Sequence, residues 1–183
     1  MNFSMEKTTP ADFQILFTNP LDKNKVKELT ILISNSKALF DALVNTILHD
    51  GVPASSRAAQ VMGYVGIIRE EWFLVHLSTI LNSLVVEENE TICRNIVRVL
   101  WKIKLPREVQ GLVADKCLKW LENKNRSIAV KAFCLHTLSK IVEHEPELGG
   151  EIRAIAESLL PYASSGLKNS AEKILVKINK FGY

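Results

Sequence analysis

Four basic residues recur along the sequence at a constant interval of 37 residues: Arg57, Arg94, Lys131 and Lys168. Lysine and arginine side chains carry a positive charge, so a regular series of them can neutralise the carboxylates or phosphates of a partner. The same series can instead bond to acidic side chains in the turns of its own repeat or a neighbouring one, as an internal ladder. Both interpretations require that the elements carrying these residues repeat in space.

Residue types that support catalysis or metal binding show no comparable pattern. Cys93, Cys117 and Cys134 are odd in number and lack Cys-x-x-Cys spacing, which argues against a disulfide framework and a thiolate zinc site. The four histidines lie in different segments. No nucleophile has a base at helical spacing, and no repeat face assembles a carboxylate pair. We therefore expect no catalytic residue, no metal, no cofactor and no enzymatic activity.

The elements that carry the basic residues show helical periodicity. When the four positions are aligned, mostly apolar residues fill the columns three, six, seven and ten residues later, which is one stripe of an α-helix. These second segments cover residues 54–68, 91–104, 127–143 and 165–180. Another apolar-periodic segment precedes each of them, at residues 37–50, 69–86, 106–122 and 146–160. Since no segment alternates as a strand would, the sequence predicts an all-α protein.

Amphipathic helix pairs that repeat cannot bury their apolar faces alone, so the period predicts a solenoid. We expect an α-α superhelix of four antiparallel helix pairs over residues 37–180, with an extra helix at about residues 22–34. Residues 1–21 are predicted to be irregular, and residues 22–183 to form one helical-repeat domain. The periodic columns predict these buried residues: Leu100, Trp101, Leu138, Ile141, Leu175 and Ile178.

The repeat resembles the HEAT family. Helix pairs recur at just under 40 residues, with a basic residue near the start of each second helix and Asp50, Glu88 or Asn125 just upstream in three of the pairs. Tyr162 takes the upstream place in the last pair, which departs from the family pattern. The resemblance implies a superhelix with first helices on the convex side and second helices on the concave side. It also implies a non-catalytic scaffold for interactions, as most HEAT-like proteins are.

Charge is unequally divided between the two sets of segments. The second segments hold 11 basic and 2 acidic residues, whereas the first segments hold 6 basic and 10 acidic ones. The concave side implied by the resemblance should therefore be positive, and a positive concave surface attracts an anionic partner. The candidate binding residues on this basic face are Arg94, Arg98, Lys102, Lys131, Lys140, Lys173 and Lys177.

A protein partner with an acidic surface is the interpretation that we favour for this face. The alternative is a nucleic-acid-binding module similar to the HEAT-like alkylpurine DNA glycosylases, which resemble this chain in being small and basic on the concave side. Those enzymes require a carboxylate and aromatic residues on that surface, and the second segments offer only Glu143 and Glu172 as carboxylates. Oligomeric state is left open by the sequence.

The longest apolar runs, such as "WFLVHL", are far shorter than the roughly 20 residues that cross a bilayer. The first residues lack the basic and then apolar pattern of a secretory signal. We therefore expect a cytoplasmic protein that does not contact a membrane.

Overall fold

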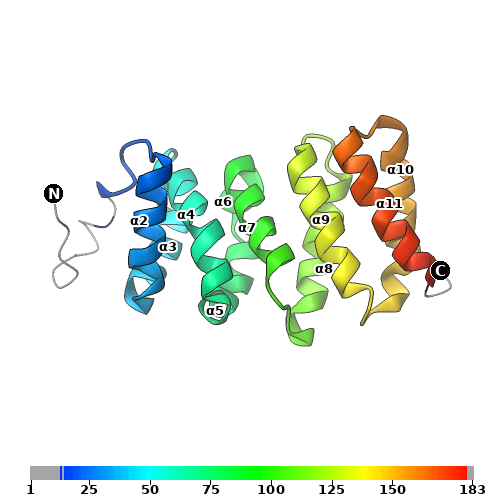
Figure 1. Ribbon diagram of the computed structural model, residues 1–183, viewed down its shortest axis with the longest axis horizontal. Coiled ribbons are helices and arrows are strands. Elements are labelled where there is room, and N and C mark those ends of the chain that lie inside the picture. Colours follow the sequence, from blue (N-terminus) through cyan, green and yellow to red (C-terminus); the bar gives the residue numbers. More distant parts are fainter. Residues whose placement is uncertain (1–12, 14, 181–183) are drawn as a thin grey trace. The chain divides into compact units, whose positions relative to one another are not determined.

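The computed structural model describes residues 13 and 15–180, and every regular element in this part of the chain is a helix. The helices pack in neighbouring pairs (Figure 1), which confirms the predicted all-α solenoid. The first half contains α2 (Lys23–Ser34), α3 (Lys37–His49), α4 (Ala54–Ile68), α5 (Glu70–Leu81), α6 (Leu84–Glu88) and α7 (Glu90–Lys102). The second half contains α8 (Arg107–Glu122), α9 (Ile128–Ile141), α10 (Gly149–Leu159) and α11 (Ser165–Lys180), with short 3₁₀ helices η1 (Pro146–Leu148) and η2 (Leu160–Tyr162).

Two compact units divide the chain, Met1–Val99 and Leu100–Tyr183, and the boundary falls within α7. In the first unit, α4 packs against both α3 and α2. In the second unit, α9 packs against α8 and α11, and α11 also packs against α10. The order of first and second helices therefore follows the predicted repeat, while the single domain over residues 22–183 stays a prediction.

Polar side chains just before two of the helices accept hydrogen bonds from the first amides of those helices. The side chain of Asp22 accepts a hydrogen bond from the Lys25 amide at 2.7 Å, which starts α2. Asn89 Oδ1 accepts from the Thr91 and Ile92 amides at 3.0 and 3.1 Å, which starts α7. These contacts satisfy amide groups that a helix N-terminus leaves without an intrahelical partner. Short polar residues in the connectors thus set where the repeat helices begin.

The predicted irregular segment 1–21 lies mostly outside the described residues, and its described part is anchored to the first unit. Phe13 and Phe17 are buried, with their rings in edge contact at 5.4 Å. Arg57 donates hydrogen bonds to the carbonyl oxygens of Phe17 and Thr18, at 2.9 and 2.5 Å. Arg57 therefore ties α4 to residues that precede the first predicted helix.

The predicted first segment at residues 69–86 is divided into two helices. Helix α5 ends at Leu81 and α6 begins at Leu84, with Asn82 and Ser83 between them. Asparagine and serine compete with the helix backbone for hydrogen bonds, and Asn82 takes the C-cap position of α5. One continuous helix over this segment was therefore the wrong interpretation of its apolar periodicity.

Most residues predicted to lie in the core do so. Leu100, Leu138, Ile141 and Ile178 are at most 1% exposed. Trp101 and Leu175 are only half-buried, so their predicted burial was wrong.

The two exceptions occupy the column seven residues after the basic position, and they have different surroundings. Trp101 is covered by side chains of one neighbouring second helix, and Leu175 lies on α11, whose helix neighbours in the described chain are α9 and α10.

Among the residues that the structure describes, no helix has the length and apolar character needed to span a membrane.

Candidate functional site

In the first unit, Arg98 of α7 packs on α4. Its guanidinium carbon lies 4.4 Å from the centroid of the Tyr64 ring, a cation–π contact. Gly63 makes this possible, because a Cβ at that position would lie 2.2 Å from Arg98 Nη2. The Nε and Nη2 atoms of Arg98 are buried without a hydrogen-bond partner. Arg98 is therefore a half-buried packing residue as well as a charged one.

The four recurrent basic residues do not form a ladder with acidic turn residues. Arg57 donates to backbone carbonyls, and Lys168 lies 3.9 Å from Glu172 of its own helix. Arg94 and Lys131 have no carboxylate within 4.0 Å among the described residues. The ladder interpretation was therefore wrong for this series, because none of the four basic side chains lies within 4.0 Å of a turn carboxylate among the described residues.

In the second unit, an aromatic group lies where α7 meets α9. The Trp101 ring stacks on the rings of Phe133 and His136, with centroids 5.4 and 5.0 Å away and planes tilted by 24° in both cases. The ammonium of Lys102 lies 3.9 Å from the Trp101 centroid. Phe133 and His136 come from successive turns of α9, so one helix face supplies both of the rings that stack on Trp101.

His136 connects this aromatic group to α11. Its Nε2 atom lies 3.3 Å from the hydroxyl of the buried Ser170. Burial lowers the pKa of His136 below its ordinary value, and the charges of Lys173 and Lys102 lower it further. Both ammonium groups therefore act on the same imidazole. We call Trp101, Lys102, Phe133, His136 and Lys173 the unit-2 basic cluster.

Two of the predicted binding residues have structural partners instead. Lys140 donates to the carbonyl oxygens of Trp101 and Ile103, at the C-terminal end of α7, where backbone carbonyls attract a cation. Lys177 forms a salt bridge with Glu143. Both ammonium groups thus join neighbouring segments of the second unit.

Three of the six basic residues in the first segments are paired within their own helices. Lys37 bonds Asp41 at 2.8 Å, Lys119 bonds Asp115 at 2.9 Å, and Arg153 lies 3.6 Å from Glu157. On the second helices, by contrast, Lys102 and Lys173 have no carboxylate within 4.0 Å among the described residues, and the same holds for Arg94 and Lys131. Four cations of the second helices are therefore uncompensated among the described residues, in line with the excess of basic residues that the charge count gives these helices.

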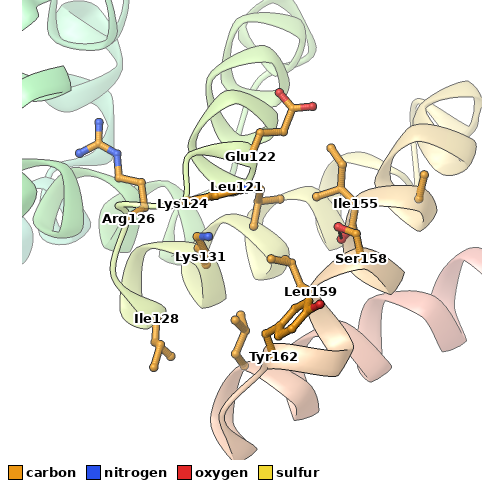
Figure 2. A pocket seen from close by; sticks show the side chains of 12 residues that line it. Leu121, Glu122, Lys124, Arg126, Ile128, Lys131, Ile155, Ser158, Leu159 and Tyr162 are labelled. Atoms are coloured by element: carbon orange, nitrogen blue, oxygen red, sulfur yellow. Dashed lines mark hydrogen bonds between the residues drawn. The ribbon is translucent and has the colours of Figure 1, made fainter.

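Lys131 lies in a different place from the unit-2 basic cluster. It lines a cleft between α8, α9, α10 and η2 with a volume of about 860 Å³, together with Leu121, Leu159 and Tyr162 (Figure 2). Six of the seven predicted binding residues are thus distributed over a packing contact, the basic cluster, two structural ties and this cleft, and the seventh, Arg94, lies on α7 in the first unit. That Arg94 and Arg98 of the first unit share one groove with the lysines of the second unit stays a prediction.

The aromatic members of the basic cluster were not predicted as site residues. One signal was present in the repeat alignment, in the column five residues after each basic position, which reads Met62, Val99, His136 and Lys173. Met62 and Val99 are fully buried, whereas His136 is half-buried and Lys173 is exposed. Where the residue in a repeat column changes from apolar to polar, the side chain at that position lies at the surface in the later repeats and not in the core.

Side chains of the described residues form no group of three or more His, Cys, Asp or Glu that could hold a metal ion. Cys93, Cys117 and Cys134 are buried thiols. These three side chains pack as small apolar groups, as expected for cysteines on apolar helix faces.

Comparison with known proteins gives one match. A family model described as a HEAT repeat domain matches residues 14–178, which is most of the chain. No curated protein and no solved structure matches the sequence.

Proposed function

Because the chain belongs to the HEAT repeat domain family, we propose that it is a non-catalytic interaction scaffold whose second helices bind an acidic segment of a protein partner. The binding residues are Lys102 and Lys173 of the unit-2 basic cluster. Helical repeats present side chains along extended surfaces, which suits recognition of a peptide chain.

The observation that carries this proposal is the unequal pairing of charge between the two kinds of helix. Two lysines of the first helices are neutralised within one helical turn, Lys37 by Asp41 and Lys119 by Asp115. Lys102 and Lys173 lack such partners among the described residues, and both lie close enough to His136 to lower its pKa. Two uncompensated charges beside a neutral imidazole attract carboxylates.

The aromatic geometry favours a protein partner over a nucleic acid. Single-strand binding surfaces use aromatic rings whose faces are open for stacking by bases. Trp101 already stacks on Phe133 and His136, and Lys102 lies 3.9 Å from its centroid, so little of its ring surface is open to a base. The cluster therefore offers charge with little room for base stacking.

We also place the protein in the cytoplasm. Three buried thiols in a chain of this size are consistent with a reducing compartment.

The proposal is tested by fluorescence anisotropy with two labelled probes, a poly-glutamate peptide and a single-stranded oligonucleotide. We expect the wild-type chain to bind the peptide more tightly at low salt, and to release it as salt rises, because exposed charges are screened over a Debye length of roughly 10 Å at 0.1 M. The double variant Lys102→Gln/Lys173→Gln should bind the peptide at least several-fold more weakly.

The matched control is Lys37→Gln/Lys119→Gln, which removes the same charge from first helices and should leave peptide binding unchanged. Equal weakening by both double variants would show that net charge alone governs binding, against the proposal. Tighter binding of the oligonucleotide would select the nucleic-acid alternative. With this single-stranded probe, contact with about four phosphates would then give a log–log salt slope of roughly −2.8.

A further inference from the structure

The cleft of about 860 Å³ in the second unit lies where helices α8 and α10 end. Helix α8 continues to Glu122, whereas α10 ends at Leu159 and gives way to η2, which contains Pro161. Proline lacks a backbone N–H and cannot continue an α-helix, so α10 does not extend past this point. The apolar side chains that line this end of the two helices therefore lie at an open cleft (Figure 2).

The floor of the cleft is formed by apolar side chains, some of which are fully buried and others only half-buried. Leu121 and Leu167 are buried, at 1% and 5% exposed, and Ile155 and Leu159 are half-buried. Figure 2 shows Leu121 and Leu159 near the middle of the cleft, with Ile155 on the side formed by α10. The volume lies within the range of about 300–1,000 Å³ that binding clefts occupy.

Tyr162 stands at the rim and is 92% exposed, although its ring is apolar. Ile128, on the α9 side of the cleft, is 52% exposed. Large side chains that line one open apolar cleft and remain exposed are typical of interaction sites, and tyrosine is among the residues that contribute most to binding energy.

The charged residues around the cleft are predominantly basic. Lys124 and Lys131 line it, and neither has a carboxylate within 4.0 Å among the described residues. Glu122 also lines it, so the cleft carries both signs with basic side chains in excess. Arg126 also lines the cleft, but Figure 2 shows its guanidinium pointing away from the other lining side chains.

We propose that this cleft is a second docking site, specific for a short segment of a partner protein that combines an apolar side chain with carboxylates. The apolar side chain packs on Leu121, Ile155 and Leu159 beneath the ring of Tyr162. The carboxylates pair with Lys124 and Lys131. The site is independent of the unit-2 basic cluster, with which it shares no residue.

The test is peptide display on the full chain. A library of random dodecapeptides is first depleted on the immobilised variant Lys124→Gln/Lys131→Gln/Tyr162→Ser, which removes peptides that bind anywhere else, including the unit-2 basic cluster. The remainder is selected on the wild-type chain. We expect enrichment of peptides in which Leu, Ile, Phe or Trp is flanked by Asp or Glu.

Synthetic copies of the enriched peptides then give the affinities by fluorescence anisotropy. The cleft variant should raise their Kd by about tenfold or more, equal to about 1.4 kcal/mol. The matched control Lys37→Gln/Lys119→Gln/Val75→Ser changes two lysines and a residue that is 71% exposed elsewhere, and should leave the Kd unchanged. Circular dichroism of both triple variants verifies that they keep the helical fold.

Three outcomes would overturn the proposal. One is the absence of enrichment, and another is enrichment of peptides without acidic residues. The third is a wild-type dimer in sedimentation that the cleft variant converts to a monomer, because a second copy of the chain would then occupy the cleft. None of these outcomes bears on binding of poly-glutamate by Lys102 and Lys173.

Discussion

At the residue scale, the absence of a side chain at Gly63 leaves room for the guanidinium of Arg98. Glycine in the middle of a helix ordinarily costs about 0.5–1 kcal/mol relative to alanine. At Gly63, however, an added Cβ would lie 2.2 Å from Arg98 Nη2 and 2.9 Å from Asn95 Oδ1. The guanidinium would have to leave its position over Tyr64, so the gain in helix propensity is offset by the lost cation–π contact.

We therefore predict that Gly63→Ala is more favourable by about 0.5–2 kcal/mol in an Arg98→Ala background than in the wild type. Urea unfolding of the two single variants and the double variant measures this coupling. Gly111→Ala is the control, because no heavy atom lies within 4 Å of a Cβ there, and it should stabilise by about 0.5–1 kcal/mol. Additive effects of Gly63→Ala and Arg98→Ala would contradict the contact.

His136 reports on the two lysines of the unit-2 basic cluster. Its pKa in the folded chain is lowered by burial and by Lys173 and Lys102, so the unfolded chain binds this proton more readily. The corresponding stability is complete above the ordinary value of 6.5 and is lost as the pH falls through the folded pKa. We predict that an NMR titration gives His136 a pKa below 6.5, and that Lys102→Gln or Lys173→Gln raises it. A pKa at or above 6.5 would show that the His136 imidazole is not partly buried beside Lys102 and Lys173.

At the scale of elements, substitutions at equivalent positions of the second helices should lower the free energy of unfolding by amounts that follow the burial of each side chain. Leu138 of α9 is fully buried, whereas Leu175 occupies the same repeat column on α11 and is half-buried. We predict that Leu138→Ala lowers the free energy of unfolding by about 2–5 kcal/mol, because it removes a buried side chain and leaves a cavity. Leu175→Ala should cost clearly less. If urea unfolding gave the same loss of unfolding free energy for both variants, the repeat position of the leucine, and not its burial, would determine the loss.

Helix positions follow from the sequence because periodicity and capping are local properties. The repeat of 37 residues predicted α4, α7, α9 and α11 to within a few residues, and Asp22 was correctly placed at the start of the extra helix. The break between α5 and α6 was missed, because Asn82 and Ser83 interrupt an apolar pattern that continues on both sides.

Side-chain partners were predicted less well, because they depend on which helices meet in space. Trp101 was expected in the core, yet it stacks on two residues 32 and 35 positions later in the sequence, Phe133 and His136. Lys140 was expected to bind a partner, and it instead caps α7 through carbonyl oxygens that carry no signal in the sequence. The candidate site was therefore predictable as a charged set of helices, but not as a cluster of particular side chains.

At the scale of the whole molecule, a formal net charge of +3 understates the charge that a partner meets. The first helices contain half of the 20 acidic side chains, and two of these, Asp41 and Asp115, pair lysines of their own helices. The second helices carry an excess of cations, of which Lys102 and Lys173 are without a carboxylate partner among the described residues. The effective charge therefore depends on the surface that is presented, and not on composition alone.

This division predicts different chromatographic behaviour for variants of equal net charge. Lys102→Gln/Lys173→Gln and Lys37→Gln/Lys119→Gln each lower the formal net charge by two from +3. Removing a paired lysine leaves its carboxylate behind in the same place, whereas removing an unpaired lysine weakens a positive surface directly. We predict that the first double variant elutes from a cation exchanger at clearly lower salt than the second, with wild type last. Co-elution of the two variants would mean that the resin senses only net charge, and that the second helices form no distinct positive surface.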